Sequence, residues 1–189
     1  MVSIWTIQRA AKGSSRLHRV SAHEQAAAAG DRYGGLVSGS VDRYAVSVDV
    51  SAKIESWDKQ SLIAVANGHT RVLLVTATTK QAAARLLASG DEPAQYVLMA
   101  VLTYLAVWPE IDRLSSITLD RDYSGDVAER IIVRRLLVML RQHRPKLKAS
   151  AVRMGNIAGS QADRLARAAY RGKRRPDREI TLAEIEALL

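Results

Sequence analysis

Hydrophobic and polar residues alternate in the first half of the chain in a way that is typical of strands. Residues 43–55 follow a period of two, with valines on one side and Ser or Asp on the other. Two further apolar runs, at 61–67 and 70–77, are separated by the sequence NGH, a typical hairpin turn. The pattern therefore predicts an antiparallel meander of three strands.

The second half of the chain alternates between helical and strand patterns. Helices are expected at 79–88, 93–108, 125–142 and 160–172, and strands at 115–120 and 147–154. The helix at 93–108 is apolar nearly all round, which is typical of a helix buried on most sides. Thr181 and Glu184 form a capping-box pattern that predicts a short final helix. This order predicts an α/β fold, a mixed sheet with helices on both faces.

The chain is expected to divide into three parts. Residues 1–40 are rich in Gly, Ser and Ala and are interpreted as an N-terminal extension, with a short strand at 3–7 and a helix at 22–29. The main domain is expected at 41–178, followed by a short C-terminal helix at 179–189. The N-terminus lacks a signal-peptide core, and the longest apolar run is too short for a bilayer core of about 30 Å. A soluble cytoplasmic protein is therefore expected.

The chain is strongly basic, and its positive charge is concentrated in one segment. It has 28 Lys and Arg against 19 Asp and Glu, a net charge of +9. Residues 141–178 alone hold twelve Lys or Arg and two Asp, so the remainder is close to neutral. Such a segment favours nucleic acid or another anionic partner, and a solvated basic face is the alternative. The chain has no cysteine, which excludes disulfides, thiolate zinc sites and cysteine nucleophiles.

Several carboxylates occur at the end of a predicted buried strand, or at a position where burying a carboxylate would be energetically costly. The sequence SITLDRDYSGD places Asp120 at a strand end, where open sheets bind ligands, with Asp122 and Asp126 shortly after. Asp49 lies inside an apolar strand, where a carboxylate requires a partner or a metal ion. Asp122 and Asp126 also fit turn and helix-cap chemistry, and Asp163 fits a capping box that begins at Ser160.

This strand order, with its acids, resembles the ribonuclease H-like superfamily over residues 43–172. The matching positions are Asp49 in VSVDVS, Asp120 in ITLD and Asp163 in GNIAGSQADRLARAA. The resemblance implies a five-stranded mixed sheet whose first three strands are antiparallel, and a divalent-metal-dependent nuclease. The three acids would hold Mg²⁺ or Mn²⁺, because hydrolysis of phosphodiesters commonly uses two such ions about 4 Å apart, bound by oxygen ligands.

The family's usual fourth acid is a Glu early in the buried helix, and Gln95 occupies that position here. Glu92, one turn earlier, is a candidate catalytic replacement, and Asp122 is a further candidate ligand. If no acid takes this role, the same fold would be a catalytically silent nucleic-acid-binding module. The expected substrate contacts are basic side chains near the last helix: Arg153, Arg164, Arg167, Arg171, Lys173, Arg174 and Arg175.

Two other interpretations remain open. The stretch LDRDYSGDVAER is similar to the Asp-x-Asp segment of Toprim domains, which also bind Mg²⁺, although the antiparallel meander fits that fold poorly. The other interpretation is an assembly protein whose basic segment binds an acidic partner. A DNA, RNA or hybrid substrate is compatible with the sequence, and so is a homodimer, while no membrane partner is expected.

Overall fold

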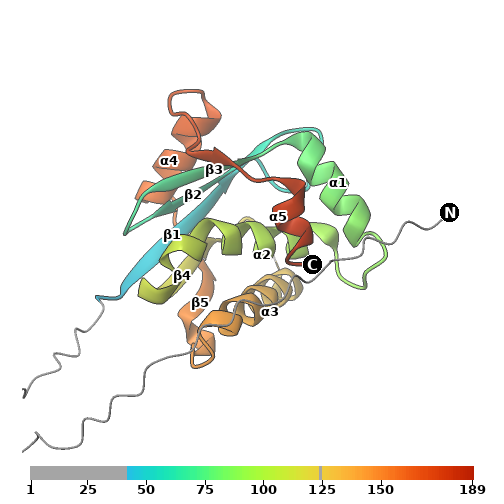
Figure 1. Cartoon of the computed structure of the whole chain (residues 1–189). Helices are drawn as coiled ribbons and strands as arrows, with labels where there is room; N and C mark the ends of the chain where they lie inside the picture. Colours follow the sequence, from blue (N-terminus) through green and yellow to red (C-terminus); the bar gives the residue numbers. More distant parts are fainter. Residues whose placement is uncertain (1–41, 124) are drawn as a thin grey trace, which may run out of the picture. The chain divides into compact units, whose positions relative to one another are not determined.

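A six-stranded mixed sheet forms the centre of the protein (Figure 1). The computed structural model describes residues 42–123 and 125–189, so the elements expected within residues 1–40 lie outside the described residues. The strands are β1 (Tyr44–Ser51), β2 (Ser61–Ala66), β3 (Arg71–Val75), β4 (Leu114–Asp120), β5 (Val152–Gly155) and β6 (Arg178–Glu179). Their order across the sheet is β5-β4-β1-β2-β3-β6.

The strand pairings confirm the predicted meander. β1 pairs with β2, and β2 with β3, in antiparallel fashion, while β4 lies parallel to β1 and β5 parallel to β4. In the hairpin turn, Gly68 has a φ of 155°, and a Cβ there would clash with the ring of Tyr44, so this position favours glycine. The two-residue β6, parallel to β3, adds a sixth strand to the five expected.

The helices occur where the apolar spacing predicts them. They are α1 (Ala77–Leu87), α2 (Ala94–Val107), α3 (Asp126–His143), α4 (Gln161–Tyr170) and α5 (Leu182–Glu186), with short 3₁₀ segments η1 (Trp108–Arg113) and η2 (Ala149–Ala151). The capping box of Thr181 and Glu184 is present at the start of α5. β5 begins five residues later than expected, because the chain turns at Lys148 and forms η2 first.

Helices cover both faces of the sheet, as expected. On β2, Ile63 and Val65 pack into the main core with α2 and α3, whereas Leu62 and Ala64 pack against Ala166 and other small side chains of α4. Figure 1 shows α4 on one side of the sheet and α2 and α3 on the other. α4 packs mainly on β1 and β2 and less on β3, so among the described residues it is centred away from β4 and β5.

The apolar helix α2 is a core helix. Among the described residues, the segment Ala94–Arg113 is the one helical stretch long and apolar enough to cross a membrane, with a mean hydropathy of 1.3. Of its most apolar 18-residue window, 67% is buried inside the fold, as in the core helix of a globular domain. The C-terminal segment belongs to the same core, because Ile180 and Ile185 are fully buried in it.

Candidate metal centre

The parallel pairing of β1 and β4 places Asp49 beside Asp120. Val48 pairs with Leu119, and each Asp is the next residue on its strand. Val48, Val50 and Leu119 point into the main core, so the two carboxylates project from the opposite face, which α4 partly covers. The Asp120 carboxylate also accepts a hydrogen bond of 3.3 Å from the Ile157 N–H.

Asp163 is brought to the same place by the first turn of α4. The Ser160 hydroxyl caps the helix by accepting a hydrogen bond from the Asp163 N–H at 3.2 Å. The Asp163 carboxylate accepts from the Gly159 N–H at 2.8 Å and pairs with Arg167 at 2.6 Å, and the Ser160 N–H bonds to Ile157 instead. Only half of the expected capping box is therefore formed.

Four carboxylates line one groove of about 230 Å³, and we call this groove the acid groove. They are Asp49, Asp120, Asp122 and Asp163. The remaining lining residues are Val50, Ser51, Ala52, Lys53 and Arg167. Ala52 has a φ of 63°, a left-handed conformation that is uncommon outside glycine, and the strand ends at this kink. Acids from three distant parts of the chain therefore converge at the C-terminal ends of the inner strands β1 and β4.

The carboxylates of the acid groove are electrostatically coupled. Burial, followed by the charges of Asp120, Asp122 and Asp163, raises the pKa of Asp49 to about 7. Burial and then Asp120 raise the pKa of Asp122 to about 6, against the opposing effect of Lys53. Asp120 thus contributes to the raised pKa of both Asp49 and Asp122. Removing negative charge from the groove, by a proton or a cation, is therefore favourable.

Glu55 supplies a further carboxylate close to Asp122. Its charge contributes to the raised pKa of Asp122, and its carboxylate accepts a hydrogen bond of 2.7 Å from the Tyr123 hydroxyl. Nothing in the sequence around Glu55 distinguishes it from a solvent-facing loop residue. Glu55 lies near Asp122 because of the path that the loop after β1 takes.

That loop is held by the fully buried Lys80 of α1. The Lys80 ammonium donates to the Ser56 carbonyl at 2.8 Å, the Ser61 hydroxyl at 2.9 Å and the Ile54 carbonyl at 3.2 Å. Burial lowers its pKa to about 8. Lys80 thereby fixes the backbone that carries Lys53 and Glu55 at the acid groove.

The structure does not bring Glu92 into the acid groove. Its carboxylate forms ion pairs with Arg134 and Arg135 of α3, and Glu92 is not among the residues that line the groove. Gln95 is half-buried in the first turn of α2 and does not line the groove either. Asp126 lies in the first turn of α3, as its helix-start interpretation predicts, and is also outside the groove.

The predicted nucleic-acid contacts are spread over the molecule. Arg167 alone lines the acid groove, while Arg164 donates to the Gly159 carbonyl nearby at 2.5 Å. Arg153 of β5 donates to the Thr118 hydroxyl of β4 at 3.2 Å.

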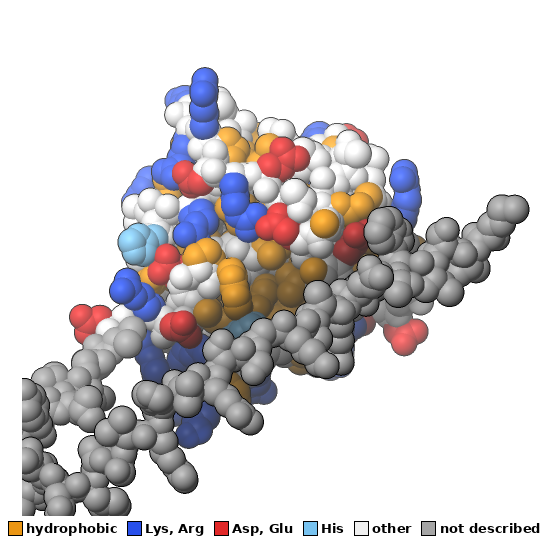
Figure 2. Space-filling view, in the orientation of Figure 1, with side chains coloured by type: hydrophobic (Ala, Val, Ile, Leu, Met, Phe, Trp, Pro, Cys, Tyr) orange, Lys and Arg blue, Asp and Glu red, His pale blue; other side chains and the backbone are white. Residues whose placement is uncertain are grey.

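A second basic group, Arg171, Lys173, Arg174 and Arg175, follows the far end of α4. Arg171 is eight residues beyond Asp163, about 12 Å along a helix. Figure 2 shows Lys and Arg side chains at the top of the molecule, in the region of the loop that follows α4 in Figure 1. Arg174 also pairs with Asp177, so part of this group stabilises its own loop.

The residues of the acid groove fit a hard divalent cation. Their donors are all carboxylate oxygens, which Mg²⁺ and Mn²⁺ prefer over softer ligands. As the side chains stand, no three acidic or histidine side chains in residues 42–123 and 125–189 are arranged to hold one ion. The groove is thus a coupled set of carboxylates that, in these side-chain positions, does not form a complete coordination shell.

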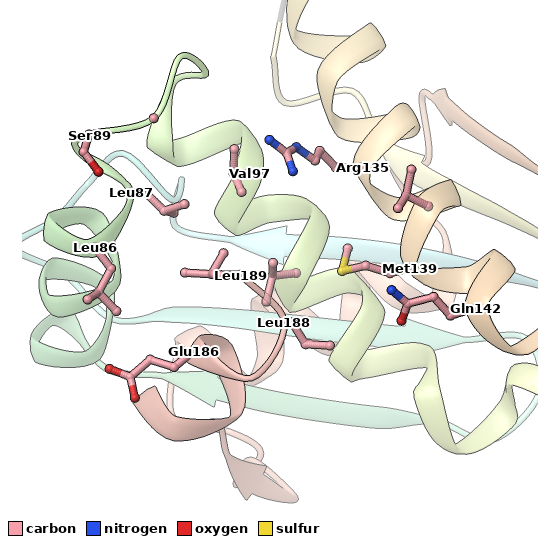
Figure 3. Close-up of a pocket in the computed structure, with 13 residues that line it drawn as sticks. Leu86, Leu87, Ser89, Val97, Arg135, Met139, Gln142, Glu186, Leu188 and Leu189 are labelled. Carbon is pink, nitrogen blue, oxygen red and sulfur yellow. The ribbon is translucent and has the colours of Figure 1, made fainter.

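A larger cavity lies away from the acids. It has a volume of about 670 Å³ and is formed by α1, α2, α3 and the C-terminal residues. Figure 3 shows Leu87, Val97, Met139 and Leu188 directed into it, with Arg135 and Glu186 near its edges. Its lining is mostly Leu, Val and Met with Glu186 as its single acidic side chain, so it lacks the set of converging acids that distinguishes the acid groove.

The convergence of the acids is the main guide to function. Comparison of the chain with models of protein families, with curated proteins and with solved structures gave no match. The acid groove and the basic side chains near it are therefore the features of the molecule that indicate a function.

Proposed function

We propose that the protein is a divalent-metal-dependent nuclease with a ribonuclease H-like fold. The observation that carries the proposal is the convergence of Asp49, Asp120 and Asp163 from β1, β4 and α4 in one groove. An antiparallel β1-β2-β3 meander, extended by parallel β4 and β5, is also the sheet arrangement that the resemblance implies. The added β6 lies at the opposite edge of the sheet from β5.

Asp49, Asp120 and Asp163 would hold Mg²⁺ or Mn²⁺, with Asp122 as a further ligand. Bound there, the cation supplies activation of water and stabilisation of the leaving oxygen in phosphodiester hydrolysis. The protein's own backbone orients the carboxylates that would bind the cation. The Ile157 N–H holds the Asp120 carboxylate, and the Gly159 N–H holds that of Asp163.

Two cationic side chains flank the acids and suit a phosphate substrate. Lys53 lines the groove from the loop after β1, and Arg167 lines it from α4. A cation beside a carboxylate cluster can bind the phosphate that the carboxylates alone would repel. The basic group after α4 would extend these contacts along nucleic acid in the cytoplasm, through salt-sensitive backbone interactions.

One observation favours a second function, a catalytically silent nucleic-acid-binding module. Gln95 stands where the family has a Glu, and Glu92 is engaged by two arginines of α3. In that case the basic side chains would bind nucleic acid while the incomplete acid set would not support hydrolysis.

Cleavage assays separate the two functions. Labelled single strands, DNA duplex, RNA–DNA hybrid and a four-way junction would be incubated with Mg²⁺, Mn²⁺ or chelator. The nuclease proposal expects metal-dependent cutting that Asp120→Asn abolishes. Asp91→Asn, which removes an exposed carboxylate elsewhere, is the matched control and should cut normally. Binding of these substrates without cutting in either metal would support the silent module.

A further inference from the structure

A second polar cavity lies at the opposite end of β1 and β4 from the acids. It has a volume of about 300 Å³ and is formed by the residue before β1, the start of β4 and the segment between α3 and β5. It shares no lining residue with the acid groove. Ser116 and Asp120 are four residues apart on β4, about 13 Å at the usual rise of a strand.

The lining of this cavity is basic and rich in hydroxyl groups. Its cationic members are Arg43, Arg144, Lys146 and Lys148. Its hydroxyl groups come from Ser115, Ser116 and Ser150, and Leu147 and Ala151 complete the wall. No carboxylate is among these lining residues. Guanidinium, ammonium and hydroxyl donors form the set that proteins use to bind phosphate oxygens.

Arg144 is held in a defined position at this cavity. Its guanidinium donates to the Ile111 carbonyl at 3.2 Å and to the Leu114 carbonyl. Burial, followed by the charge of Arg43, lowers the pKa of Arg144, while Asp112 acts in the opposite direction. Two guanidinium groups that disfavour each other's charge are stabilised by an anion placed near both.

The cationic side chains of this cavity have no acidic partner in the described part of the chain. Across residues 42–123 and 125–189, none of Arg43, Arg144, Lys146 and Lys148 forms an ion pair within 4.0 Å. Figure 2 shows Lys and Arg side chains at the lower edge of the view, where Figure 1 draws the loop between α3 and β5.

A bulge in β4 directs two serines to this cavity. Tyr44 pairs with Leu114 and Ala45 pairs with Ser116, so Ser115 is an extra residue in the ladder. Bulges change the direction of side chains along a strand, and here both Ser115 and Ser116 line the cavity. Hydroxyl donors are thereby added to the cationic ones.

We propose that this cavity is a binding site for a phosphate group, separate from the acid groove. The phosphate belongs either to a nucleic-acid backbone or to a small phosphate-bearing molecule, because both present the same anionic oxygens. The site does not depend on the proposed nuclease activity. Three of its four cationic residues, Arg144, Lys146 and Lys148, belong to the basic segment 141–178, but the sequence did not show that they meet Arg43 and the serines of β4 in one cavity.

The test uses the double variant Lys146→Gln, Lys148→Gln. Both side chains are exposed, so the fold should persist, which circular dichroism and thermal unfolding would verify. The matched control is Lys59→Gln with Arg85→Gln, two exposed residues that lose the same charge but do not line the cavity. All measurements are made in chelator, so that no cleavage contributes.

One arm titrates inorganic phosphate by calorimetry at constant ionic strength. Wild type and control should bind it, and the double variant should bind at least tenfold more weakly. The other arm follows a labelled DNA duplex by fluorescence anisotropy over a range of salt. In the double variant, the slope of log affinity against log salt should be less steep by about 1 to 2, because up to two phosphate contacts are lost.

A change in the duplex arm assigns a nucleic-acid backbone phosphate to the cavity. A change in the inorganic phosphate arm alone assigns a small phosphate-bearing ligand. If the double variant matches the control in both arms, the proposal is wrong.

Discussion

Asp49→Asn should make the protein more stable at pH 8 in the absence of metal. Asp49 is 6% exposed, and burial together with Asp120, Asp122 and Asp163 raises its pKa from 3.8 to about 7. Ionised Asp49 therefore carries an unfavourable free energy in the folded state that an uncharged Asn of the same shape avoids. Three pKa units at 1.36 kcal/mol each set an upper limit of about 4 kcal/mol.

The pH dependence of this effect follows from proton linkage. Between about pH 4 and pH 7 the folded protein keeps a proton on Asp49 that the unfolded chain has lost. The folded state thus binds more protons, and the free energy of unfolding falls as pH rises through this window. Asn does not titrate, so the advantage of Asp49→Asn should be near zero at pH 4 and reach about 2–4 kcal/mol above pH 7.

Chemical denaturation followed by circular dichroism, in chelator at pH 4.5, 6 and 8, measures this difference. Asp91→Asn is the control and should show no such trend, because Asp91 is exposed. Added Mg²⁺ should stabilise the wild type and reverse the order of the two proteins. An Asp49→Asn variant less stable than wild type at pH 8 in chelator would refute the electrostatic account of the acid groove.

Four further substitutions test the fold and the limits of the site. Lys80→Met should cost about 2–4 kcal/mol in urea unfolding, because it leaves the Ser56 carbonyl and other buried acceptors without a donor; an unchanged midpoint would contradict this. Ile185→Ala should cost about 2–4 kcal/mol by the same assay, since the side chain is fully buried, and a smaller loss than 1 kcal/mol would place the C-terminal helix outside the core. Glu92→Gln should leave any cleavage rate within about twofold of the wild-type rate, whereas Asp163→Asn should abolish cleavage. Equal losses of activity in the two variants would show that Glu92 is part of the site.

Sequence patterns predicted most of the fold because the elements are locally consistent. The alternating valines of β1, the NGH turn and the apolar α2 each indicate their structure without reference to the rest of the chain. β6 was not predicted, because two exposed residues, Arg178 and Glu179, form a strand only by pairing with β3. The start of β5 was misplaced for a similar reason, since η2 depends on local turns rather than on hydrophobic period.

The candidate site was predictable where an acid had a defined position on a strand or helix. Asp49 and Asp120 lie on neighbouring strands, so their proximity follows from topology, and Asp163 follows from the first turn of α4. Glu55 and Glu92 could not be placed in this way. Their environments depend on how a loop is held by Lys80 and on two arginines of α3, which are tertiary contacts without a sequence pattern.

Calorimetric titration with Mg²⁺ and Mn²⁺ tests the central claim, that the acid groove is a metal centre. The account predicts saturable binding to the wild type and to Asp91→Asn. It predicts loss of that binding in Asp120→Asn, because Asp120 lines the groove and its charge raises the pKa of both Asp49 and Asp122. Binding that persists unchanged in Asp120→Asn, or no binding to the wild type, would contradict it.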